Sequence, residues 1–147
     1  MRVFYTVIII AIASIIISFN MHETESVDLG ASGVPLCDFR MEPCRYNAEW
    51  GSAILSSSVQ TITPEDVFNL NLQFSDAKNT EIKSAFLQGR DMYMGKIPLF
   101  FNSKQSYFTT EVLIGACTES QMVWRMTVIV NVNQEVKTLH FDFVSYQ

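Results

Sequence analysis

The sequence predicts an all-β protein: an immunoglobulin-like antiparallel β-sandwich of about seven strands, preceded by one N-terminal transmembrane helix. Two observations lead to this fold class. Residues 3–19 form an apolar run without a charge. Several later segments alternate between apolar and polar side chains, as strands with one buried face do. A small barrel is the alternative fold.

The apolar run decides the domain organisation. It is just long enough to cross a bilayer, which needs about 17–25 helical residues. A cleaved signal peptide is the alternative, but signal peptidase sites have small residues at alternate positions, and here the large residues Phe19 and Met21 stand where small ones would be expected. We therefore expect residues 1–20 to be a membrane anchor or signal peptide, residues 21–35 a tether, and residues 36–147 an exported domain.

The charges around the run predict its orientation. Arg2 precedes it, whereas Glu23, Glu25 and Asp28 follow it. The positive-inside rule therefore predicts a single pass of the inner (cytoplasmic) membrane, with the C-terminal domain facing the periplasm. The membrane is thus one expected partner, reached through this helix. Fifteen acidic side chains oppose ten basic ones, a net charge of −5, which makes nucleic acid an unfavourable partner.

Strands are predicted most strongly where the alternation is strict. These stretches are Val67–Phe74, Met122–Val132 and Leu139–Phe143. Between the last two, Asn131–Glu135 suits a hairpin connection. Weaker candidates are Ala48–Ser56, Glu81–Leu87, Lys96–Phe101 and Tyr107–Ile114. One apolar face on each strand favours two antiparallel sheets packed face to face.

The three cysteines, Cys37, Cys44 and Cys117, allow one disulfide and one free thiol. Exported proteins form disulfides readily. A bond between Cys37 and Cys44 would close a local loop before the first long strand, and we favour this pairing. Cys117 pairing with either of the others is the alternative.

The stretch GRDMYMGKIP, residues 89–98, places two methionines one residue apart between glycines. If this stretch is extended, Met92 and Met94 project to the same face. Thioethers and thiolates select Cu(I) among transition metals. Met92, Met94, Met122 and Cys117 are therefore candidate ligands of a Cu(I) site. The alternative is that these methionines fill an irregular core or contact a partner.

Enzymatic signatures are missing from the sequence. It contains no GxGxxG, GxxxxGK[ST], HExxH, CxxC or GxSxG motif. His140 and Asp142 share one face of a predicted strand, but no credible nucleophile accompanies them. We expect no catalytic residues.

The motifs together resemble a group of uncharacterised small exported bacterial proteins with the pattern C…PC…GxxMxMG…C…MxW. The matching elements are Cys37, Pro43–Cys44, Gly89, Met92, Met94–Gly95, Cys117 and Met122–Val123–Trp124. One membrane helix followed by a β-sandwich is also similar to the FixH and YtkA-like proteins, some of which are linked to assembly of copper-containing oxidases. This resemblance implies a non-enzymatic accessory role near the membrane.

The sequence therefore predicts a non-enzymatic, membrane-tethered periplasmic accessory protein that binds a protein partner, with Met92–Pro98 in the contact surface. The alternative is a Cu(I)-binding module that assists metal delivery or copper-oxidase assembly through Met92 and Met94. Cu(I) is the one cofactor that the residues suggest.

Overall fold

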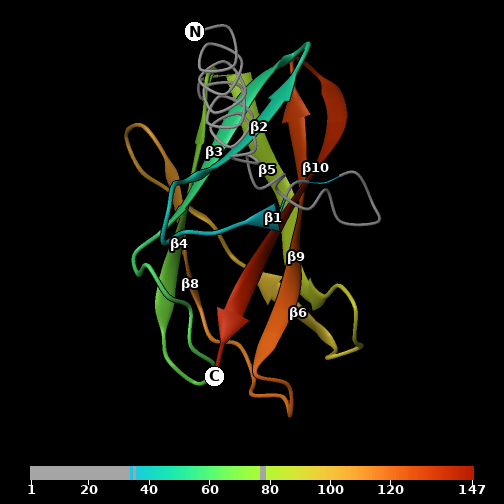
Figure 1. Ribbon diagram of the computed structural model, residues 1–147. Helices are drawn as coiled ribbons and strands as arrows, with labels where there is room; N and C mark the ends of the chain where they lie inside the picture. The colour runs from blue at the N-terminus through green and yellow to red at the C-terminus, as the bar shows by residue number, and fades with distance from the viewer. Residues whose placement is uncertain (1–33, 35, 77–78) are drawn as a thin grey trace, which may run out of the picture.

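The computed structural model describes residues 34, 36–76 and 79–147, which form two five-stranded sheets (Figure 1). In chain order the strands are β1 (Leu36–Cys37), β2 (Cys44–Ala48), β3 (Gly51–Ser57), β4 (Phe68–Phe74), β5 (Thr80–Gly89), β6 (Lys96–Leu99), β7 (Asn102–Ser103), β8 (Phe108–Val112), β9 (Gln121–Val132) and β10 (Glu135–Tyr146). The all-β class is confirmed. The expected anchor, residues 1–20, and the whole of the expected tether except Val34 lie outside the described residues. Among the described residues, no helix is long and apolar enough to span a membrane.

The two sheets have the orders β1-β10-β9-β5-β6 and β2-β3-β4-β8-β7. All neighbouring strands pair antiparallel except β1 and β10, which are parallel. Contacts between the sheets include the rings of Tyr46 on β2 and Phe141 on β10, whose centroids lie 6.1 Å apart. Two separate sheets facing one another are a sandwich rather than the alternative small barrel.

The core follows the alternation that predicted the strands. Along β9 and β10 every second side chain is buried, and the same holds along β4. These residues are Met122, Trp124, Met126, Val128, Val130 and Val132 on β9, Leu139, Phe141 and Phe143 on β10, and Phe68, Leu70, Leu72 and Phe74 on β4. Their burial against the opposite sheet is the main source of stability, since each fully buried large apolar side chain contributes about 1.5–3 kcal/mol.

Three short strands were not predicted. β1 and β7 have two residues each, too few to show a periodicity. β2 did carry a signal: Cys44, Tyr46 and Ala48 alternate with Arg45 and Asn47. The expected strand from Ala48 to Ser56 is wrong at its start, because the chain turns at residues 49–50 and β3 begins only at Gly51.

The disulfide joins Cys37 to Cys44, with Cα atoms 5.4 Å apart, so the favoured pairing is confirmed. The spacing of the two cysteines did not predict that this bond would join the two sheets. Cys37 lies on β1 in one sheet and Cys44 on β2 in the other. The bond therefore ties the two sheets together at one edge, and a loop of this length stabilises by about 2–3 kcal/mol.

The β9–β10 hairpin, drawn in orange and red in Figure 1, is confirmed and turns through Asn133 and Gln134. Both residues have positive φ, 51° and 70°. Two such residues match a type I′ turn, whose twist suits the flanking strands. Asparagine tolerates this conformation, whereas glutamine has no special preference for it.

Replacing Gln134 with glycine should raise the free energy of unfolding by about 0.5–1 kcal/mol. A side chain in the left-handed region costs about 1–2 kcal/mol, and glycine loses part of that gain as chain entropy. Urea denaturation would measure the change. Gln134→Ala keeps the Cβ atom and is the control; an equal gain in that variant would show that backbone strain is not the cause.

Candidate functional site

The methionine loop, residues 90–95, connects β5 to β6 and folds back over the end of β5. The chain bends at residues 90–92, and Arg90 N donates to Val123 O at 2.9 Å. A Cβ atom on Gly89 would lie 2.1 Å from Met92 O and 2.5 Å from Met122 Cε. Only glycine allows so close an approach of backbone and side chain.

A buried carboxylate fixes this loop to the sheet. Asp142 lies on the outer face of β10, yet its side chain is 0 % exposed. Arg125, its neighbour across the strand pair, donates from Nε to Oδ1 and from Nη2 to Oδ2, both at 2.7 Å. Arg90 Nη1 contacts Oδ2 at 3.5 Å and donates through Nε and Nη2 to Asp91 at 2.8 and 2.9 Å. Arg90 therefore joins the loop to the sheet.

The pKa shifts agree with this geometry. The hydrogen bond from Arg90 lowers the pKa of Asp91, and the bond to Asp91 raises the pKa of Arg90. The hydrogen bonds to Asp142 likewise raise the pKa of Arg125. All three groups therefore stay charged at neutral pH.

His140 and Asp142 bond to different partners. Asp142 bonds to Arg125 and Arg90, while His140 Nδ1 lies 3.2 Å from Thr127 Oγ1. Burial, followed by the positive charge of Arg125, lowers the pKa of His140. Asp142 thus has a structural role that its spacing from His140 did not reveal.

The structure brings three of the four candidate metal ligands to one hollow of about 300 Å³. Met92 comes from the methionine loop, Cys117 from the connection between β8 and β9, and Met122 from the start of β9. Leu36, Asp91, Glu119, Gln121, Val123 and Val144 complete the lining. We call this the sulfur hollow.

Met94 does not line the sulfur hollow. It is partly buried and packs against the hydrophobic core. The expectation that Met92 and Met94 share a face assumed an extended chain, and the bend at residues 90–92 removes that premise. Met94 thus packs against the core, as the alternative interpretation of these methionines expected.

Cys117 is a free thiol and is half-buried. Its Sγ accepts a hydrogen bond from Glu119 N at 3.2 Å. Gln147 holds the same turn, since its backbone N donates to Ser120 O at 3.0 Å and its side chain donates to Cys117 O. Within residues 36–76 and 79–147, no three His, Cys, Asp or Glu side chains gather in a way that would hold a metal ion.

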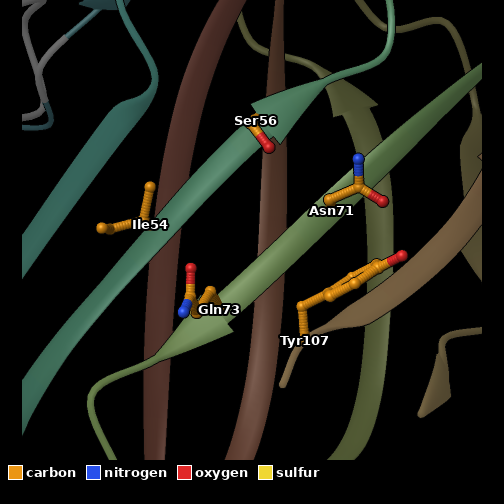
Figure 2. A pocket seen from close by; sticks show the side chains of 5 residues that line it. All are labelled: Ile54, Ser56, Asn71, Gln73 and Tyr107. Carbon is orange, nitrogen blue, oxygen red and sulfur yellow. The ribbon is translucent and has the colours of Figure 1, made fainter. Parts of the chain in front are cut away.

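A second hollow, of about 230 Å³, lies on the outer face of the other sheet (Figure 2). Ile54 and Ser56 line it from β3, Asn71 and Gln73 from β4, and Tyr107 from just before β8. Its lining is neutral, with amides, a hydroxyl and a phenol. The predicted wet face of β4 contributes the two amides.

No known protein-family model matches the chain, and no curated protein matches it. Among solved structures, it is similar to the crystal structure of a DUF4426 family protein from Pseudomonas aeruginosa PAO1. The TM-score is 0.50 at 11 % sequence identity, and the alignment covers 70 % of this chain and 96 % of the other. At this identity the likeness concerns the fold alone.

Proposed function

We propose that the chain is a non-enzymatic accessory protein of the inner membrane. Residues 1–20 anchor it, the immunoglobulin-like sandwich faces the periplasm, and the stretch Met92–Pro98, from the methionine loop into β6, binds a protein partner. The uncharged run before the domain supports the anchor. The Cys37–Cys44 disulfide supports an oxidising compartment.

The observation that carries the binding role is the presentation of Tyr93. Its side chain is 90 % exposed, although large aromatic side chains usually reduce their contact with water. Arg90 holds the start of the loop to the sheet through Val123 O and Asp142. A tyrosine on a loop that hydrogen bonds already hold in place loses little conformational entropy on binding. Tyrosine is also enriched among the residues that dominate binding energy at protein interfaces.

The Tyr93→Ala variant should lose partner binding without losing stability. A residue that dominates an interface contributes about 2 kcal/mol or more, which corresponds to roughly a 30-fold loss of affinity. The thermal midpoint should stay unchanged, because the ring packs against little of the domain. Photo-crosslinking of the full chain in native membranes would provide the measurement, with the photoreactive group at position 93.

The matched control places the same group at position 136. Val136 is 67 % exposed and lies at the far end of the β9–β10 hairpin. A defined adduct from position 93, absent from position 136 and competed away by the wild-type chain but not by Tyr93→Ala, is the expected result. Identical adducts from both positions would contradict the proposal.

A further inference from the structure

Sulfur-bearing side chains from the methionine loop, the connection between β8 and β9, and the start of β9 line the sulfur hollow. We infer that this hollow is a binding site for one soft monovalent cation, Cu(I) or its analogue Ag(I), with Met92, Cys117 and Met122 as ligands. The inference does not depend on partner binding through Tyr93. It also changes the ligand set expected from sequence spacing, because Met94 is left out.

Two of the ligands are placed by a shared neighbour. Met122 is 9 % exposed and its Cε lies so close to Gly89 that a Cβ there would be 2.5 Å away. The carbonyl of Met92 lies over the same glycine. Gly89 thus allows the loop residue and the strand residue to line one hollow. Met122 is paired with Ser145 of β10, and the next residue, Val123, accepts a hydrogen bond from Arg90 N, so its backbone position is well defined.

Cys117, the third proposed ligand, differs from the two methionines because its deprotonated sulfur carries a negative charge. Cys117 Sγ accepts a hydrogen bond from Glu119 N, which orients the sulfur while leaving lone pairs for a metal ion. Thiolates and thioethers are soft ligands and prefer Cu(I) to harder cations. Binding converts Cys117–SH and Cu(I) into Cys117–S–Cu(I) and one released proton, with no change in oxidation state.

The surroundings favour a small cation. The carboxylates of Asp91, which is paired with Arg90, and of Glu119 line the same hollow. Leu36, Val123 and Val144 supply apolar surface, which limits competition by water for the metal ion. Two neutral thioethers and one thiolate together balance a single positive charge.

The test is titration of the purified full chain with Ag(I), which needs no reductant and so leaves the Cys37–Cys44 disulfide intact. We expect one ion per chain and about one proton released per ion. Loss of an outer-shell partner typically weakens metal binding about 10–100-fold, and loss of a direct ligand should cost at least as much. Met92→Leu, Met122→Leu and Cys117→Ser should each show such a loss, and Cys117→Ser should also abolish proton release.

Met94→Leu is the matched control, because it lies two residues from Met92 yet outside the hollow. Methionine and leucine have similar volumes, so both loop variants should fold. Unchanged binding in Met94→Leu beside weakened binding in Met92→Leu would support the site, even if Met122→Leu failed to fold. Equal losses in both loop variants, wild-type binding in Cys117→Ser, or no binding by the wild-type chain would overturn it. Cu(I) under anaerobic conditions should give the same ranking of variants.

Discussion

An Asp142→Asn variant should lose about 3–5 kcal/mol of its free energy of unfolding, as expected when one partner of a buried ion pair is removed. The Asp142 carboxylate is fully buried and accepts two hydrogen bonds from Arg125 and a longer one from Arg90. An amide of the same shape cannot accept both bonds from Arg125 or balance its charge. The variant would remove the carboxylate that accepts both bonds from the largely buried guanidinium of Arg125, whereas Arg90 would keep its bonds to Asp91.

Chemical denaturation followed by tryptophan fluorescence would measure this loss. Asp91→Asn is the control, because Asp91 bonds to the same cluster but its side chain is 63 % exposed, and exposed ion pairs contribute about 0–1 kcal/mol. The Arg125→Gln, Asp142→Asn double variant should lose less than the sum of the single losses. A loss below about 1 kcal/mol in Asp142→Asn would show that the cluster does not hold the fold together.

The same variant should loosen the methionine loop. Arg90 is the link between Asp142 and residues 91–95, so amide hydrogen exchange in this loop should become faster than in β9 or β10. In that case both the stability of the domain and the order of the loop would depend in part on the Asp142 carboxylate. Asp142 on the outer face of the sheet would thereby influence Tyr93, which we propose binds a partner, and Met92, which we propose binds a metal ion.

A Trp124→Ala variant should lose about 3–5 kcal/mol, the usual cost of removing a large aromatic side chain from a core. Trp124 is 1 % exposed, and its Nε1 donates to Ser145 Oγ at 3.1 Å. The substitution would remove buried apolar surface and leave the Ser145 hydroxyl without this partner. Both effects lower the free energy of unfolding.

Two companion variants separate these effects by thermal and chemical denaturation. Ser145→Ala keeps the tryptophan packing but removes the hydroxyl that accepts from Trp124 Nε1 and donates to Met122 O, which should cost about 1–3 kcal/mol. Trp124→Phe keeps most of the apolar surface and should be less destabilising than Trp124→Ala. If Trp124→Ala unfolded at the same denaturant concentration as the wild type, the packing assigned to this residue would be wrong.

Trp124 also explains part of the Met122–Val123–Trp124 motif in structural terms. Met122 and Trp124 lie on the same face of β9 because side chains alternate along a strand. Trp124 packs in the core, whereas Met122 lies at its margin and lines the sulfur hollow. One motif therefore combines a core residue with a proposed ligand, and sequence spacing does not separate the two roles.

The sequence by itself determined the all-β class, the main strands and the β9–β10 hairpin. The reason is that these features are local: alternation with period two reports which side chains of a strand are buried, and the turn residues lie between two such runs. The Cys37–Cys44 pairing was favoured for the same reason, since the two residues are close along the chain.

Tertiary structure alone decided which distant residues meet. The parallel pairing of β1 with β10 places Cys37 in one sheet and Cys44 in the other. The bend after Gly89 separates Met92 from Met94 and brings Met92 to Cys117 and Met122. The burial of Asp142 depends on Arg90 and Arg125 arriving from two other segments. Register, bends and packing between strands set these contacts, and no local pattern records them.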